Sequence, residues 1–266
     1  MHIGAIDQSA TLGESWLHRS GPVAKLVAFG VVLAAVMVTW NLLVLASIVA
    51  VLSAALVSAR AKARLAYGLA AYPAFFAVVF ALASAPDALT GAVIVLKALA
   101  AGLAAVALVL TTPYPQIFAP LQRVVPGIVG DSLLMTYRST FLLLDKFTNL
   151  LTAVRLRSGV QAGRPLRALR STTQALGGLL LYSFDLSQRD YDIMRLRGYQ
   201  DRLRVALPAT TSPGRDAAMV ACAVGLLGVS ALWRAAAMSL NPYSWLVPIP
   251  ALACLLLALL LRWRKS

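Results

Sequence analysis

Of the 266 residues, 60% are hydrophobic and only 13% are charged; soluble domains usually carry about 25% charged residues, so the composition excludes a soluble protein and indicates an integral membrane protein. The 24 lysines and arginines outnumber 10 acidic residues and give a net charge of +14. Fourteen of these basic residues lie between Thr112 and Asp216, outside the long apolar runs, which is typical of cytoplasmic loops of membrane proteins and argues against a nucleic-acid-binding protein.

The apolar runs predict about six membrane-spanning helices. Residues 26–59 form one run, and since about 20 residues cross a bilayer core, the run predicts two short helices that fold back at Trp40-Asn41. Further spans are predicted over residues 67–85, 88–111, 217–233 and 245–261. Every strongly basic loop then falls on one side, so both termini are expected in the cytoplasm.

Lys97 lies within the fourth predicted span, and a charged residue at membrane depth is a functional candidate by default. The alternative function is therefore a self-contained secondary transporter with a midmembrane substrate site near Lys97. Two observations count against it. The side chain is about ten residues from Asp87, so it can snorkel to the outer headgroups or form a structural pair. The chain also lacks the paired inverted repeat of broken helices that usually marks such a site.

Three regions are expected: four spans in residues 1–112, a cytoplasmic region in 113–215, and two spans in 216–266. Four prolines from Pro113 to Pro126 predict a broken path after the fourth span. A long amphipathic helix is predicted over residues 131–157, because Asp131, Arg138, Asp145 and Thr152 recur every seven residues on an otherwise apolar helix. A second is predicted over residues 166–197, and its apolar face comprises Leu176, Leu180, Phe184, Tyr191 and Met194.

Both amphipathic segments end in near-copies of one phrase, 40 residues apart. The copies read Ala153-Val154-Arg155-Leu156-Arg157-Ser158-Gly159 and Ile193-Met194-Arg195-Leu196-Arg197-Gly198-Tyr199. Within each copy the two arginines are about 200° apart around a helix, and we expect Arg157 and Arg197 to face the cytosol. Basic residues can complement a helix end before a glycine cap or hold a helix on anionic lipid. The helix-end role does not account for two copies, which favour two equivalent docking partners, and lipid anchoring stays open as the alternative.

No catalytic pattern accompanies these ends. The sequence has no phosphate-binding Gly-Lys-Ser/Thr loop, nucleophile elbow, zinc helix motif or paired-carboxylate cluster. Cys222 and Cys254 lie in apolar runs without metal-ligand spacing. We therefore expect a non-catalytic protein with no cofactor and no metal site, which depends on a partner with two motor domains.

Several short motifs, in their order and spacing, resemble the transmembrane T component of energy-coupling factor (ECF) transporters, the EcfT/CbiQ family. They are Thr111-Thr112-Pro113, Tyr137-Arg138, the Ala-x-x-x-Arg-Ser of Ala153 to Ser158, and Met194-Arg195-Leu196-Arg197-Gly198-Tyr199. Together with Lys25 near the first span, the resemblance covers roughly residues 16–204.

The resemblance implies an all-α, multi-pass subunit of a bacterial or archaeal cell membrane, with long cytoplasmic coupling helices. Its implied partners are two ATP-binding cassette ATPase subunits and a substrate-binding membrane subunit (S component), for uptake of a vitamin or a metal ion such as cobalt or nickel. The implied docking triplets are Leu156-Arg157-Ser158 and Leu196-Arg197-Gly198, although the family usually has alanine before each arginine. Supporting positions on the coupling helices would be Ala153, Met194, Arg155, Arg195, Arg138 and Asp145.

Overall fold

The computed structural model describes residues 15–59, 63–122, 125–158, 165–199, 212–236 and 245–263. Its elements are helical throughout this part of the chain. The chain forms two compact units: the first combines Met1–Ile117 with Leu207–Ser266, and the second is Phe118–Ala206.

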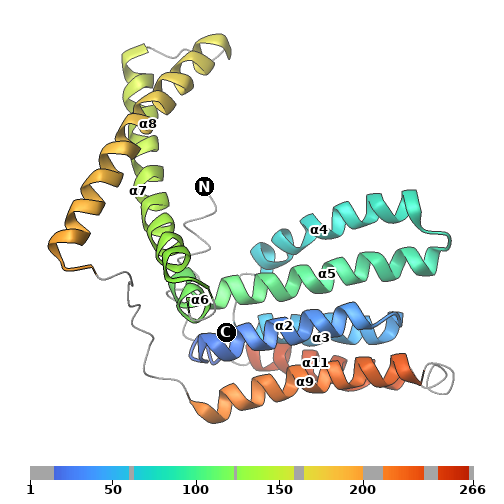
Figure 1. The fold of residues 1–266 in the computed structure, drawn as a ribbon. Coiled ribbons are helices and arrows are strands. Elements are labelled where there is room, and N and C mark those ends of the chain that lie inside the picture. The colour runs from blue at the N-terminus through green and yellow to red at the C-terminus, as the bar shows by residue number, and fades with distance from the viewer. Residues whose placement is uncertain are drawn as a thin grey trace. The chain divides into compact units, whose positions relative to one another are not determined.

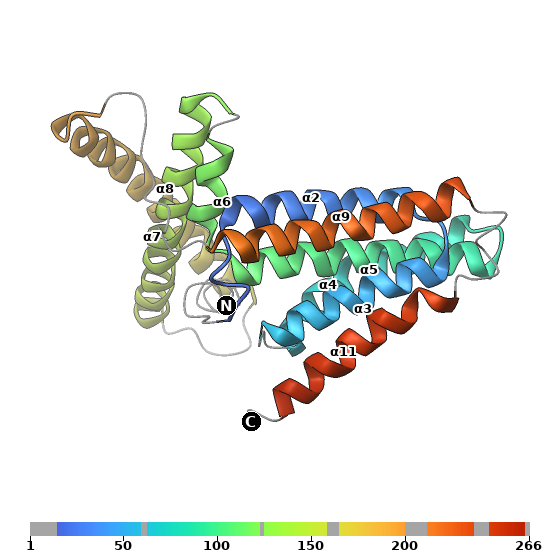
Figure 2. The ribbon, with the colours of Figure 1, turned by 90° about the horizontal axis from the view of Figure 1, so that it is seen from below.

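The described part of the first unit is a bundle of apolar helices (Figures 1 and 2). They are α2 (Pro22–Val38), α3 (Leu42–Ser58), α4 (Ala63–Ser84), α5 (Ala88–Thr111), α9 (Pro213–Ala235) and α11 (Pro248–Trp263). Helix α5 packs against α2, α3 and α4, while α9 packs on α2 and α11 packs on α3. The core lies where α2, α3 and α5 meet, around the fully buried Ala35, Leu45, Ile48 and Leu103.

Three of these helices are long and apolar enough to cross a membrane, namely Leu65–Ser84 within α4, α5, and α9. The other three are shorter, and the 17-residue α2 and α3 are at the lower limit of a spanning length, about 25 Å. Large apolar side chains such as Phe75 and Phe76 of α4 are exposed, as expected of a surface that contacts lipid. The prediction of an all-helical membrane protein is confirmed, and a helix covers each predicted apolar segment.

The predicted fold-back at Asn41 is observed, and its cause is a helix cap. Helix α2 ends at Val38 and α3 begins at Leu42. The Asn41 Oδ1 atom accepts hydrogen bonds from the backbone N–H groups of Leu43 (2.9 Å) and Val44 (3.5 Å). Asparagine is a preferred residue at this position because its short side chain satisfies the first free donors of a helix.

The proline-rich stretch contains a helix that the sequence did not predict, α6 (Tyr114–Leu121). Pro115 stands in its first turn, where a backbone donor would have no partner within the helix. Pro120 stands one residue before its end and removes the hydrogen bond that this position would donate to the Gln116 carbonyl. The expectation of a continuously broken path was therefore wrong for this segment, although α5 does end at Thr111 as expected.

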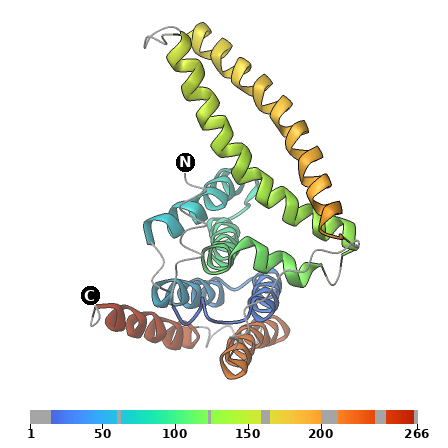
Figure 3. The same cartoon turned by 90° about the vertical axis from the view of Figure 1, so that its left-hand side faces the viewer.

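The second unit is dominated by two long helices that pack together, α7 (Gly127–Ser158) and α8 (Pro165–Leu196). Figure 3 shows α8 returning alongside α7 in the opposite direction. Each has 32 residues and is about 48 Å long. Helix α7 begins four residues before the predicted start, and α8 begins at Pro165, whose fixed φ suits the first helical position. Neither is among the helices that are apolar enough to span a membrane.

Candidate functional site

The middle of the α7–α8 pair is held together by small residues and one cation–aromatic contact. Ala175 is 1% exposed. A Cβ added at Gly178 would lie 3.7 Å from Cδ1 of Leu150, so α7 approaches α8 closely at this point. The Lys146 ammonium stands 4.7 Å from the centre of the Tyr182 ring, a favourable arrangement because the ring face is electron-rich.

The polar residues that recur every seven positions on α7 are exposed to solvent, except the first of them. Arg138, Asp145 and Thr152 are exposed, whereas Asp131 is only 6% exposed. Its carboxylate accepts hydrogen bonds from the Gln122 side-chain amide (3.1 Å) and from the Tyr199 hydroxyl (2.5 Å). Asp131 is therefore buried, unlike the other three members of this polar stripe, because these two side chains bring compensating donors to it.

Helix α8 presents its predicted apolar face outward. Leu180 and Phe184 are 62% and 70% exposed, and Leu176 and Tyr191 are exposed as well. The side chains that pack toward α7 include Ala175 and Tyr182 instead. The periodicity thus identified an apolar face correctly, but the small residues of another face allow the closer approach to α7.

The second copy of the repeated phrase forms a complete glycine-terminated helix end. Gly198 has a φ of +72°, in the left-handed region that favours glycine. The N–H of Gly198 donates to the Arg195 carbonyl (3.1 Å), and the N–H of Tyr199 donates to the Met194 carbonyl (3.1 Å). This is the Schellman pattern, which satisfies the last carbonyls of a helix. It fixes Arg197 at the boundary between α8 and the following turn.

The first copy ends α7 in a similar position. Arg157 is the penultimate residue of the helix and Ser158 is the last. The side chains of Arg155, Arg157 and Ser158, and the whole of Gly159, lie outside the part of the chain that the structure describes. The leucines that precede the two key arginines behave alike, because Leu156 is 80% exposed and Leu196 is 88% exposed.

The structure does not bring the two phrases together. Because α7 and α8 run in opposite directions, their C-terminal ends lie at opposite ends of the pair, about 48 Å apart by helix length. Among the supporting positions, Ala153 is exposed and Met194 is half-buried. The Arg195 guanidinium lies 5.8 Å from the centre of the Tyr191 ring, one turn earlier on α8. That arginine therefore contacts its own helix.

Lys97, the candidate for a midmembrane substrate site, is engaged by the turn between α2 and α3. Its ammonium donates a hydrogen bond to the Met37 carbonyl (3.3 Å) and stands 4.0 Å from the centre of the Trp40 ring. The carbonyl belongs to the last turn of α2, where a cation is favoured by the helix dipole. A structural pair, one of the interpretations left open by the sequence, accounts for this lysine.

Lys25 joins two motifs that are far apart in the sequence. It is 5% exposed, and its ammonium donates to the carbonyls of Thr111 (2.9 Å) and His18 (3.4 Å). A ring nitrogen of His18 is 3.2 Å from the Leu110 carbonyl, so these two side chains satisfy the C-terminal carbonyls of α5. Lys25 is thus buried against the C-terminal end of α5.

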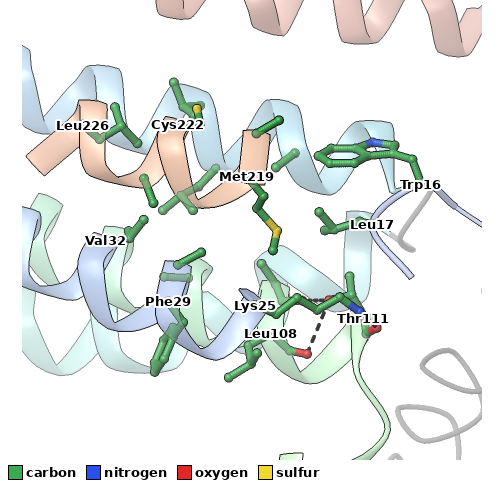
Figure 4. Close-up of a pocket in the computed structure, with 18 residues that line it drawn as sticks. Trp16, Leu17, Lys25, Phe29, Val32, Leu108, Thr111, Met219, Cys222 and Leu226 are labelled. Carbon is green, nitrogen blue, oxygen red and sulfur yellow. Dashed lines mark hydrogen bonds between the residues drawn. The ribbon is translucent and has the colours of Figure 1, made fainter. Parts of the chain in front are cut away.

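A mainly apolar cavity of about 250 Å³ adjoins this lysine, and its lining comes chiefly from α2, α3, α5 and α9. Figure 4 shows Lys25 directed toward Thr111 at one end of the cavity, with Val32, Met219, Cys222 and Leu226 among the other lining residues. Across the described residues, no group of three or more His, Cys, Asp or Glu side chains is placed to hold a metal ion.

Comparison with known proteins places these features in a family. The family model CbiQ, described as "Cobalt transport protein", matches residues 13–207, which include Lys25, the Thr111-Thr112-Pro113 motif and both arginine phrases. A curated protein of Rhodobacter capsulatus, "Cobalt transport protein CbiQ", is 30% identical over 218 residues, covering 77% of this chain and 88% of that protein. The chain therefore belongs to the CbiQ family of cobalt transport proteins, the T components of ECF transporters.

Proposed function

We propose that this T component couples two ATP-binding cassette ATPase subunits to a separate substrate-binding membrane subunit, and that Leu156-Arg157-Ser158 and Leu196-Arg197-Gly198 dock the ATPases. The observation that carries the proposal is the repetition of one phrase at the C-terminal ends of two packed helices. Helix ends that bind no partner do not require the same sequence at both ends.

The exposed leucines support a docking role for these ends. Leu156 and Leu196 present most of their surface to solvent on helices too polar to span a membrane. Burying a leucine side chain in a partner groove stabilises a complex by about 1.5–3 kcal/mol. The adjacent arginine supplies a planar fork of donors suited to carboxylates and carbonyls of the groove. In each pair the leucine would thus make apolar contact with the groove, and the arginine would fix the orientation of the helix end through its hydrogen bonds.

The outward apolar face of α8 suits the substrate-binding membrane subunit. Leu180, Leu181 and Phe184 are 62%, 75% and 70% exposed. A membrane subunit can cover such a face with its own apolar surface, and a displacement of α8 would then reach that subunit directly. Helices α7 and α8 accordingly lie on the cytoplasmic side, together with both termini, consistent with the basic residues of this region.

The cargo is inferred from the relative alone. Because the matching protein of Rhodobacter capsulatus is a cobalt transport protein, we propose a divalent transition-metal ion such as cobalt as the substrate of the assembled transporter. Substrate recognition would reside in the other membrane subunit, and ATP hydrolysis in the ATPases. This chain would contribute neither a catalytic group nor a cofactor.

The test is a pull-down of the tagged chain with its ATPases, combined with uptake measurements, for Arg157→Ala, Arg197→Ala and the double variant. Losing a partly desolvated charge contact typically costs about 2–5 kcal/mol, so each single variant should weaken uptake and retain some ATPase. The double variant should release the ATPases or abolish uptake. Arg155→Ala and Arg195→Ala should be milder.

Arg189→Ala is a matched control, because this exposed arginine of α8 pairs with Asp185 on its own helix (2.6 Å). It should bind ATPases and support uptake as the unmodified chain does. A double Arg157→Ala, Arg197→Ala variant that retains its ATPases and transports normally would show that the phrases only anchor the helices to lipid.

A further inference from the structure

The second docking end is bonded to the beginning of the other long helix. The Tyr199 hydroxyl donates to Asp131 Oδ2 at 2.5 Å, across 68 residues of sequence. The other carboxylate oxygen of Asp131 accepts a hydrogen bond from the Gln122 amide at 3.1 Å. Asp131 thus connects the residue that follows the α8 docking end with the residue that follows α6.

Very little chain separates the docking arginine from this bond. Only Gly198 stands between Arg197 and Tyr199. The N–H groups of Gly198 and Tyr199 make the Schellman hydrogen bonds to Arg195 and Met194, and the N–H of Arg197 donates to the carbonyls of Ile193 and Met194. A shift of the backbone at Arg197 therefore displaces Tyr199 as well. Tyr199 donates its hydrogen bond to Asp131, which is 6% exposed. A hydrogen bond to a buried charge is among the stronger ones in proteins.

At the other side of the link, the residue that follows α6 lies close to the first turn of α7. A Cβ added at Gly130 would lie only 2.5 Å from Cγ of Gln122, so α7 passes Gln122 where only glycine leaves room. This approach holds the Gln122 amide within reach of Asp131. The link from Tyr199 through Asp131 to Gln122 is therefore continuous, and it is tightly packed at its Gln122 end.

The two phrases differ at the position that makes the link. With the 40-residue offset, Tyr199 of the second copy corresponds to Gly159 of the first, and glycine has no side chain to donate a hydrogen bond. The copies match at both arginines and at the intervening leucine and differ at the other four positions. One of these four is the residue that bonds Asp131.

We propose that Tyr199 is a positioning residue that transmits displacement of the Arg197 docking end to the start of α7 through Asp131. This inference rests on the proposed docking function and assigns the two docking ends different tasks. Movement at Arg197 reaches the start of α7 directly through Tyr199, whereas the first copy has Gly159 at the equivalent position, which has no side chain to make such a bond.

The experiment uses the assembled transporter in liposomes and compares Tyr199→Phe, Asp131→Asn and the double variant. The readouts are ATPase retention and the number of substrate ions taken up per ATP hydrolysed. Tyr199→Phe removes one oxygen, so assembly and hydrolysis should persist while uptake per ATP falls roughly tenfold, equivalent to about 1.4 kcal/mol. The double variant should be no worse than Tyr199→Phe, because both substitutions act on the same bond.

Tyr72→Phe is the control, since that tyrosine of α4 is 70% exposed, belongs to the other compact unit and should leave uptake per ATP unchanged. An unchanged ratio in Tyr199→Phe would overturn the proposal. So would a loss of assembly in both single variants with a normal ratio in the complexes that remain, because the bond would then be structural only. Failure of the docking function is a separate result, visible as ATPase retention in the Arg157→Ala, Arg197→Ala double variant.

Discussion

Replacing Gly198 by alanine should loosen the end of α8, and the structure supplies the magnitude. Gly198 has a φ of +72°, and placing an L-residue in this region costs about 1–2 kcal/mol. A Cβ at this position would meet nothing within 4 Å, so no steric clash with other residues adds to this backbone term. The helix end should therefore be destabilised by about 1–2 kcal/mol. The hydrogen bonds donated by Gly198 and Tyr199 should open more often as a result.

Gly177 of the same helix provides a control, because alanine should stabilise the helix there. A Cβ added at Gly177, in the interior of α8, would also meet nothing within 4 Å. Alanine is favoured over glycine there by about 0.5–1 kcal/mol, because it loses less backbone freedom on folding. Gly177→Ala should thus stabilise α8, and the two glycine-to-alanine changes should separate end geometry from helix propensity.

Hydrogen exchange measured on peptides from the last turns of α8 provides the assay. In Gly198→Ala, opening should become about 5–30-fold more frequent, which corresponds to one or two kcal/mol. Gly198→Asn should have a smaller effect, since asparagine tolerates the left-handed region. Exchange that is unchanged or slower in Gly198→Ala would refute the reasoning, because the glycine-terminated end would then not be the stable end of α8.

Two further predictions concern the membrane unit and its orientation. Lys97→Met should leave uptake largely intact, because the Lys97 ammonium makes structural contacts with the Met37 carbonyl and the Trp40 ring. Loss of uptake in a complex that still assembles and hydrolyses ATP would instead indicate a role in the substrate path. Cysteines introduced at the exposed positions Gln174 and Asp87 should react with an impermeant thiol reagent from the cytoplasmic side and from the outside, respectively; labelling of Gln174→Cys from outside would contradict ATPase docking on α7 and α8.

Much of the helical framework could be predicted from the sequence because its signals are local. Apolar run length predicts the membrane helices, and asparagine and glycine carry the backbone preferences that mark Asn41 and Gly198 as helix ends. The heptad-spaced stripe likewise predicts the exposure of Arg138 and Asp145. Each of these inferences depends only on residues within a few turns.

The remaining features depend on contacts that no local pattern encodes. Asp131 is buried because Gln122 and Tyr199 reach it from other segments, and Lys25 is buried because α5 ends beside it. The outward face of α8 shows the same limit, since periodicity marks an apolar face without identifying what covers it. The prolines of α6 concealed a short helix because proline argues against a helix except in its first turn, where Pro115 stands, and Pro120 lies beyond that turn.

The opposite directions of α7 and α8 have a geometric consequence for their partners. Contacts advance in opposite senses along the pair, from Lys146 with Tyr182 to Leu150 with Gly178. The two copies of the phrase therefore end their helices at opposite ends of the pair and in opposite directions. A dimeric motor with its own two-fold symmetry can offer one groove twice and meet the same phrase each time. Under the proposed docking scheme, the Tyr199 bond to Asp131 lies beside one docking end, and the other end has glycine at the equivalent position. A symmetric motion of the motor would then reach α7 and α8 unequally.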